Sequence, residues 1–283
     1  MIEPDILRRA VRTALEEDIG PGDVTSIAVI PEGTSARGRF VVKSRLVVCG
    51  LFVAREVFKQ IDPDVRFGAL CDEGSSHDPG SILATLEGSA RSILMAERTA
   101  LNFLQRMSGI ATRTRSCVKI AASGVATIAD TRKTVPGLRQ FDREAVRTGG
   151  GENHRAGLYD AILIKDNHWR LAGGIRESVR RARAAFPDEG KNRRPIQIEV
   201  GGLAELDEAL ASGVDAVLLD NMNESVLKAA VSRAAGQVFL EVSGGVTEER
   251  IPSLAALAVQ RISMGSLTHS SPAADIALEV EPS

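Results

Sequence analysis

The chain has 283 residues, of which 43% are hydrophobic and 25% are charged, and its formal net charge is −2. This composition fits one large or two moderate globular domains with a hydrophobic core, and it excludes a disordered or fibrous protein. A chain so close to neutrality is not expected to bind nucleic acid in general.

The sequence also argues against a membrane or secreted protein. No apolar run reaches the roughly 18–20 residues that cross a bilayer. The first twenty residues carry acidic side chains and no unbroken apolar stretch, which is not the pattern of a signal peptide. Cys49, Cys71 and Cys117 are scattered and form no C-x-x-C pair. We therefore expect reduced thiols, no zinc knuckle and a cytoplasmic location.

The first hundred residues mix helical and strand-like patterns. Pro4 suits the first turn of an amphipathic helix that Gly20 ends. Further along, Phe40 and Val42 alternate with polar residues, as in a strand with one buried face. The expected elements are helices over 4–17 and 89–107 and strands over 36–50, 65–70 and 82–86. This order predicts an α+β unit, an N-terminal α/β sandwich domain with an antiparallel sheet.

The pattern changes after about residue 110. Six short apolar runs follow, with helical stretches such as 203–212 and 222–235 between them: ATIAD, AILIK, IQIEV, DAVLLD, VFLEV and RISMG. Alternating strands and helices predict a parallel sheet. The stretch is shorter than the roughly 250 residues of a full eightfold barrel. We therefore predict an incomplete, open α/β barrel of six or seven strands over 109–269, after a first domain over 1–108 on which a tail over 270–283 packs.

Charged residues end most of these runs, and a core strand has no use for a charge unless it emerges at a rim. They are Asp130, Lys165, Glu199, Asp220 and Glu241. In α/β barrels the chemistry takes place at the rim formed by the carboxyl ends of the strands. The strand ends therefore predict the place of the active site.

Cations gather around the first two of these strand ends, at Arg132, Lys133, Arg155 and Lys165, close to His154. Arginine presents a planar fork that matches carboxylate or phosphate, and lysine supplies a mobile point charge. The alternative is a solvated surface cluster that contributes little. Three consecutive glycines over 149–151 are costly in conformational entropy, so we expect the backbone to approach another group closely there.

Small residues follow the later strands, in EVGG (199–202), VSGGV (242–246) and MGSLTHS (264–270). Backbone N–H groups of such loops form anion sites, and a phosphate site after the last strands recurs in barrels. Glu199 and Asp220 could hold Mg²⁺ together with water and substrate oxygens, bind ribose hydroxyls, or stabilise a developing sugar cation. Each acid could instead pair with Lys133 or Lys165, which would also place it in the site. Together these features predict an enzyme for a phosphorylated, multiply anionic substrate.

A family resemblance is carried by long motifs in order along nearly the whole chain: EDIGPGDVTS, ERTALNFLQRMSGIAT, DTRKTVPGLR, AVRTGGGENHR, GLYDAILIKDNH, LLDNM and THS. These stretches closely resemble quinolinate phosphoribosyltransferases. The resemblance implies that quinolinate and phosphoribosyl pyrophosphate, with Mg²⁺, yield nicotinate mononucleotide, CO₂ and pyrophosphate in NAD biosynthesis. It also implies a homodimer, or an assembly of dimers, in which the neighbouring subunit completes each site.

The same resemblance implies roles for individual residues. Lys133, Glu199 and Asp220 would be catalytic, and the two acids would also face the Mg²⁺. Arg98 would reach the quinolinate from the partner subunit. The residues that would bind the substrates are Arg98, Thr131, Arg132, Lys133, His154, Arg155, Lys165, Glu199, Asp220, Ser243, Gly244, Gly245, Met264, Gly265, Ser266 and His269.

Two other functions remain open at this point. A branch of the family associated with molybdenum transport keeps the TRKT element, but we expect it to lack intact GGGENHR and KDNH patterns. A non-catalytic sugar-phosphate sensor would explain the glycine loops and the arginines. It would not explain two rim acids beside a complete cluster for a pyridine dicarboxylate, so the sequence favours the enzyme.

Overall fold

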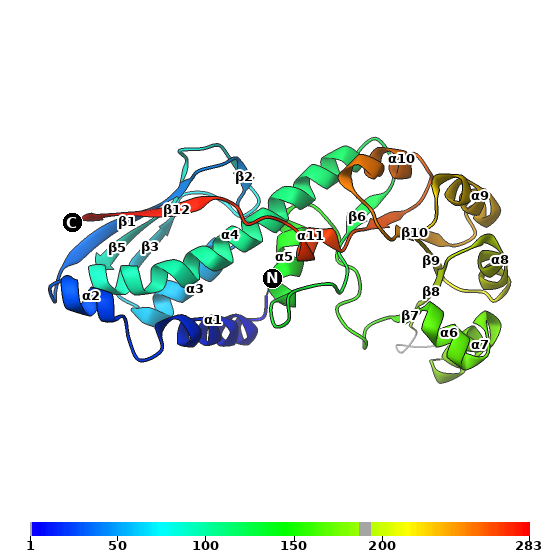
Figure 1. Cartoon of the computed structure of the whole chain (residues 1–283), viewed down its shortest axis with the longest axis horizontal. Coiled ribbons are helices and arrows are strands. Elements are labelled where there is room, and N and C mark those ends of the chain that lie inside the picture. Colours follow the sequence, from blue (N-terminus) through cyan, green and yellow to red (C-terminus); the bar gives the residue numbers. More distant parts are fainter. Residues whose placement is uncertain (1, 187–193) are drawn as a thin grey trace. The chain divides into compact units, whose positions relative to one another are not determined.

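A computed structural model describes residues 2–186 and 194–283, and the chain falls into two compact units (Figure 1). The first unit comprises Met1–Arg115, Thr134–Gly150 and Ser266–Ser283. The second unit comprises Ser116–Lys133 and Gly151–Gly265. The first unit is thus assembled from three separate stretches of sequence.

An antiparallel sheet forms the centre of the first unit, in the strand order β12-β1-β5-β3. Strands β2 and β4 form a separate two-stranded sheet in the same unit. The expected α+β unit is therefore confirmed. The elements that begin in this unit are α1 (Pro4–Ile19), α2 (Val24–Val29), β1 (Ser35–Val42), β2 (Leu46–Val47), α3 (Leu51–Ile61), β3 (Arg66–Ala69), β4 (Ser76–His77), β5 (Ile82–Ser89), α4 (Ala90–Ala121), α5 (Arg139–Thr148), α11 (Ser266–His269) and β12 (Ile276–Pro282).

Two of the expected boundaries in this unit were wrong. The strand expected over 36–50 ends at Val42, and Leu46 begins the separate strand β2. A register shift between Phe40 and Val41 bends β1, so Val41 is buried as well as Phe40 and Val42. The helix expected over 89–107 continues as α4 to Ala121, because its apolar positions keep packing beyond the stretch where the pattern is clearest.

A buried ion pair holds the segment 134–150 within the first unit. The guanidinium of Arg106 donates to both carboxylate oxygens of Asp142, over 2.9 and 2.8 Å, and also to the carbonyl of Thr268 over 3.1 Å. Asp142 is fully buried, and its carboxylate also accepts from the N–H of Val135. Arg106 therefore joins α4 to α5 and to α11.

The triple glycine has a structural role at its first position. A Cβ on Gly149 would lie 2.6 Å from the carbonyl oxygen of Ala111 and 2.6 Å from Cβ of Thr114. The close approach that the glycines predicted is therefore made, at Gly149, with helix α4 of the same unit. Arg139 also belongs to the first unit, where it donates to the hydroxyl of Thr134.

A six-stranded sheet forms the second unit, in the order β6-β11-β10-β9-β8-β7, and all its strand pairs are parallel. Each of the six apolar runs forms one of these strands. Because β6 and β7 are the two ends of the order, the sheet is an open barrel, which confirms the expected fold. Its elements are β6 (Thr127–Ala129), β7 (Ile162–Ile164), α6 (Asp166–Ala172), α7 (Ile175–Ala185), β8 (Ile196–Val200), α8 (Leu203–Ala211), β9 (Ala216–Asp220), α9 (Glu224–Ala234), β10 (Phe239–Ser243), η1 (Glu248–Arg250), α10 (Ile251–Ala255) and β11 (Arg261–Ser263).

Within the described residues 2–186 and 194–283, no helix combines the length and apolar character needed to span a membrane. All three cysteines lie in this described part, and none of them forms a disulfide. Cys49 and Cys117 are buried, so they serve as small apolar side chains in the core.

Candidate active site

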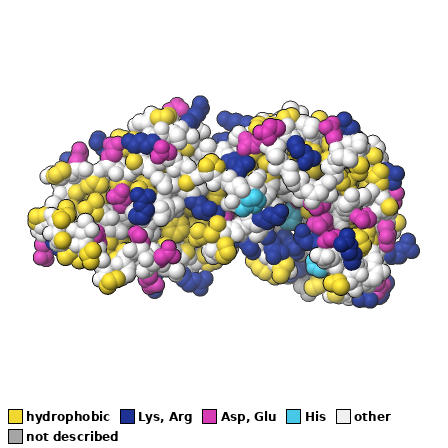
Figure 2. Space-filling view, viewed as in Figure 1, with side chains coloured by type: hydrophobic (Ala, Val, Ile, Leu, Met, Phe, Trp, Pro, Cys, Tyr) yellow, Lys and Arg dark blue, Asp and Glu magenta, His cyan; other side chains and the backbone are white. Residues whose placement is uncertain are grey.

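Most of the predicted site residues lie in the second unit, at or after the carboxyl ends of its parallel strands. Figure 2 shows Lys and Arg side chains gathered beside His side chains on one face of this unit. Arg98, Ser266 and His269 belong to the first unit. The residues in the second unit are Thr131, Arg132, Lys133, His154, Arg155, Lys165, Glu199, Asp220, Ser243, Gly244, Gly245, Met264 and Gly265.

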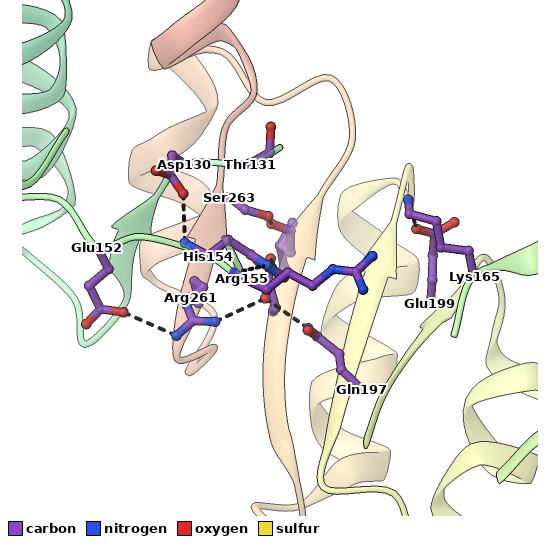
Figure 3. Close-up of polar contacts among 12 residues, drawn as sticks. Asp130, Thr131, Glu152, His154, Arg155, Lys165, Gln197, Glu199, Arg261 and Ser263 are labelled. Atoms are coloured by element: carbon purple, nitrogen blue, oxygen red, sulfur yellow. Dashed lines mark hydrogen bonds and ion pairs between the residues drawn. The ribbon is translucent and has the colours of Figure 1, made fainter. Parts of the chain in front are cut away.

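Lys165 and Glu199 form an ion pair at the rim, with Nζ of Lys165 2.8 Å from Oε2 of Glu199 (Figure 3). Lys165 follows β7 and caps helix α6, where its backbone N–H donates to Nδ1 of His168 over 2.9 Å. The pairing of a rim acid with Lys165, one of the alternatives from the sequence, is therefore confirmed. The pair places a cation and an acid on neighbouring strands, within reach of one substrate.

Arg132 and Arg155 bring two positive charges together. The pKa of Arg155 is lowered, first by partial burial and then by the charge of Arg132, while Asp160 opposes both effects. The guanidinium of Arg155 also donates to the carbonyl of Ala161 over 3.2 Å. Arginine presents a planar fork that matches carboxylate or phosphate, so a site for such an anion stays a prediction for these two residues.

Asp130 holds the loop that carries His154 and Arg155. This fully buried carboxylate accepts from the backbone N–H of His154 over 2.7 Å and from Nδ2 of Asn153 over 2.6 Å. A parallel bridge between Ala129 and Glu152 continues β6 into the same loop. The end of β6 therefore fixes where the loop over 152–155 leaves the sheet.

Glu241 corrects the expectation that charged residues of the strands emerge at the rim. Its side chain is fully buried in the middle of β10, and its Oε1 lies 3.4 Å from Nε2 of His154. Its Oε2 accepts from Nε2 of Gln197 over 2.9 Å and lies 3.5 Å from the guanidinium of Arg261. Burial raises the pKa of Glu241, but the contacts with His154, Ser263 and Gln197 outweigh it and lower the pKa to about 2.

Asp220 and the glycine loop after β10 are joined by Asn221, a residue that the sequence did not single out. The amide Nδ2 of Asn221 donates to Oδ2 of Asp220 over 2.7 Å, and its backbone N–H donates to the carbonyl of Ser243 over 3.0 Å. Asn221 has a φ of 54°, a left-handed conformation that asparagine tolerates better than most residues. A signal was present, because a short amide after a strand often marks such a turn.

Gly244 has no room for a side chain. A Cβ there would lie 2.3 Å from Oδ1 and 2.6 Å from the backbone nitrogen of Asn221. Gly244 also has a φ of 91°. The guanidinium of Arg250 donates to the carbonyls of Gly244 and Gly245 over 3.4 and 3.1 Å. Because a trans peptide directs its C=O and its N–H to opposite sides, the following N–H groups point away from Arg250. That this loop binds an anion through these N–H groups stays a prediction.

Glu199 and Asp220 at the rim could supply only some of the ligands of a metal ion. In the described portion of the chain, no three His, Cys, Asp or Glu side chains are close enough together to hold a metal ion. One oxygen of Glu199 is bound by Lys165, and one oxygen of Asp220 by Asn221. The second oxygen of each carboxylate is of the hard kind that Mg²⁺ prefers, with substrate and water supplying the remaining ligands.

The fold and this rim define a class of protein, namely an α/β-barrel enzyme with an anion-binding active site. Comparison with known proteins identifies the family. Residues 23–108 match the family model of the N-terminal domain of quinolinate phosphoribosyl transferase, and residues 110–279 match that of its C-terminal domain. The chain therefore belongs to the quinolinate phosphoribosyl transferase family.

Individual relatives agree along the whole length. The chain is 39% identical to the nicotinate-nucleotide pyrophosphorylase [carboxylating] of Mycobacterium leprae, covering 98% of each chain. It is 38% identical to the probable enzyme of that name from Bacillus subtilis, covering 97% of this chain and 93% of the relative. The solved structure of the nicotinate-nucleotide pyrophosphorylase from Francisella tularensis superposes with a TM-score of 0.93 at 39% identity, covering 99% of this chain and 98% of the other.

Proposed function

We propose that this protein transfers the phosphoribosyl group of phosphoribosyl pyrophosphate to the ring nitrogen of quinolinate and releases CO₂ and pyrophosphate. The product is nicotinate mononucleotide, a precursor of NAD. The observation that carries this proposal is the rim itself, where Lys165 and Glu199 pair at the ends of β7 and β8 and the charge of Arg132 acts on Arg155. A dianionic pyridine beside a sugar phosphate satisfies these charges.

Each group has a specific task in this proposal. Arg132, Arg155 and Lys165 bind the two carboxylates of quinolinate, and Lys133 lies between quinolinate and the donor. Transfer passes through an oxocarbenium-like state, which the carboxylates of Glu199 and Asp220 stabilise electrostatically. The residues proposed to cradle the 5-phosphate are Ser243, Gly244, Gly245, Met264, Gly265 and Ser266, with assistance from His269.

Decarboxylation then needs no further catalytic group of the protein. Alkylation of the ring nitrogen makes the pyridine a cation, and this cation accepts the electron pair of the bond between C2 and its carboxylate. CO₂ leaves, and a proton from solvent takes its place on C2. We assign no covalent nucleophile to the reaction.

Magnesium is proposed as the cofactor, held by Glu199 and Asp220 through water and substrate oxygens. When bound, it neutralises part of the charge on the leaving pyrophosphate. The donor set supports this assignment, because both side chains keep an oxygen that no contact of the rim uses.

A homodimer, or an assembly of dimers, with shared active sites is also proposed, with Arg98 reaching the quinolinate of the partner subunit. The test uses mixed dimers of Arg98→Ala and Lys165→Ala chains. One of the two sites in each mixed dimer would be intact, so activity should return to about a quarter to a half of the wild-type value. No recovery would contradict shared sites.

The location is proposed to be cytoplasmic, consistent with three cysteines that form no disulfide. The first experiment mixes the purified protein with quinolinate, phosphoribosyl pyrophosphate and Mg²⁺ and follows nicotinate mononucleotide and CO₂ together. Equal amounts of both, lost when Mg²⁺ is omitted or when nicotinate replaces quinolinate, are expected. Binding of both substrates without turnover would instead favour a sugar-phosphate sensor. No binding of quinolinate would favour the molybdenum-associated branch.

A further inference from the structure

A charged network crosses the interior of the barrel, below the rim and apart from the residues proposed to touch substrate. Its centre is Glu241 on β10, a carboxylate with no exposed surface. Gln197 on β8 and Arg261 on β11 reach it from other strands. Glu152 extends the network beyond Arg261 (Figure 3). Burying a charge in a core is costly unless it is paired, so this arrangement requires an explanation.

His154 connects this network to the rim. Its Nδ1 accepts a hydrogen bond of 2.7 Å from the backbone N–H of Arg155. A ring nitrogen that accepts a hydrogen bond carries no hydrogen, so the ring hydrogen lies on Nε2. That atom faces Oε1 of Glu241 at 3.4 Å, and the side chain of His154 is 11% exposed. Nδ1 of His154 is therefore held by a hydrogen bond, and Nε2 lies at ion-pair distance from Glu241.

We infer that Glu241 is a positioning residue, which fixes the tautomer and orientation of His154. His154 in turn sets the backbone of Arg155 and so directs its guanidinium at the substrate carboxylate. The inference rests on the proposed assignment of Arg155 to quinolinate. It deepens that assignment by tracing how the guanidinium is held in place.

The hydrogen-bonding groups around Glu241 explain why a carboxylate is needed. Gln197 Nε2 and Arg261 donate to its Oε2 over 2.9 and 3.5 Å, and Nε2 of His154 lies 3.4 Å from its Oε1. A carboxylate offers only acceptors on both oxygens, whereas the amide of glutamine offers one acceptor and one donor group. Glu241→Gln therefore places an N–H₂ group against a donor while keeping the size of the side chain.

The first test compares substrate binding by calorimetry. Glu241→Gln is expected to weaken quinolinate binding by at least tenfold while phosphoribosyl pyrophosphate binds within about twofold of wild type. Asp215→Asn is the matched control, because Asp215 is also a paired carboxylate of this unit. It accepts from Arg183 over 2.9 Å and from the N–H of Ile196 over 2.7 Å. These contacts lie at the amino ends of β8 and β9, and the rim lies at their carboxyl ends. The control is expected to change stability and not quinolinate affinity.

A second variant guards against simple misfolding. The double variant Glu241→Gln with Gln197→Glu keeps the charge and the side-chain volume in the core. The amide at position 241 can then donate to the carboxylate at position 197, while the amide oxygen at position 241 still faces His154. Quinolinate affinity is expected to return to within about threefold of wild type. An exchanged pair that folds but binds no better than the single variant would overturn the inference.

The tautomer itself is a readout that does not depend on activity. The chain has only four histidines, so the ring nitrogens of His154 can be assigned by NMR of ¹⁵N-histidine-labelled protein. We expect the hydrogen to lie on Nε2 in the wild type and a mixture of tautomers in Glu241→Gln. A hydrogen on Nδ1 in the wild type would overturn the inference. If Arg155→Ala binds quinolinate like the wild type, the assignment of Arg155 itself is wrong, even where the tautomer is as expected.

Discussion

Lys165 and Glu199 lie on neighbouring strands, and their charged atoms are 2.8 Å apart, although the Lys165 side chain is half exposed. An exposed ion pair contributes only about 0–1 kcal/mol to the free energy of unfolding. Its position at the carboxyl ends of β7 and β8, and not its strength, is what matters for the protein.

This relationship predicts that function and stability separate at Lys165. Lys165→Ala is expected to lower kcat/KM for quinolinate by about a hundredfold, equivalent to about 2.7 kcal/mol, while the melting temperature changes by no more than about 3 °C. Steady-state kinetics and thermal unfolding of the same preparation check this. Lys228→Ala is the control, because Lys228 forms an exposed pair with Glu224 on helix α9 and should leave both quantities unchanged. A large loss of stability without loss of activity would contradict the prediction.

The contact of Gly244 with Asn221 predicts a loss of donor binding on substitution. A Cβ on Gly244 would overlap Asn221, so Gly244→Ala should displace both the anion loop and Asp220. We expect the affinity for phosphoribosyl pyrophosphate to fall by at least tenfold. Gly213→Ala is the matched control, because Gly213 also has a positive φ, of 71°, but nothing lies within 4 Å of its added Cβ. It should cost only about 1–2 kcal/mol of stability, from backbone strain.

The buried pair of Arg106 and Asp142 predicts a strictly structural effect. Removing one partner leaves an uncompensated charge, so Arg106→Ala should lower the free energy of unfolding by about 3–5 kcal/mol. Denaturant unfolding measures this. Arg106→Ala should resemble Asp142→Ala, and the double variant should be less destabilised than the sum of the two. Additive losses would show that the two side chains act independently.

Glu241 predicts a dependence of stability on acid. Its pKa in the folded protein is about 2, below its ordinary value of 4.5. The stabilisation is therefore fully present above about pH 4.5, and it is lost progressively as the pH falls toward 2. Other acids, such as Glu177, whose pKa is also lowered to about 2, titrate in the same window. The difference between wild type and Glu241→Gln isolates the effect, and the two free energies of unfolding should converge below pH 4.5. A constant difference down to pH 2 would contradict the assignment.

Local patterns were sufficient for the order of elements and for the position of most charged residues near the strand ends. The six apolar runs each became a strand because their alternation with helices leaves a parallel sheet as the way to bury them. Arg132, Arg155, Lys165, Glu199 and Asp220 lie at or after strand ends as expected, because polar groups after parallel strands collect at one edge, and their roles stay predictions. The helix that becomes α4 was found but ended too early, since tertiary packing extends it.

The sequence by itself therefore determined the class of fold, the family and the residue types at the rim, because these depend on short-range periodicity and on long ordered motifs. Only the tertiary structure decided the direction of individual side chains. The sequence pattern predicted that Glu241 lies at the rim, but its carboxylate is buried and contacts several polar side chains. The close approach expected of the glycines is made by Gly149 with helix α4. Arg106 finds Asp142 from 36 positions away. Such pairings depend on which groups the fold brings together and shields from water, and no local pattern encodes that.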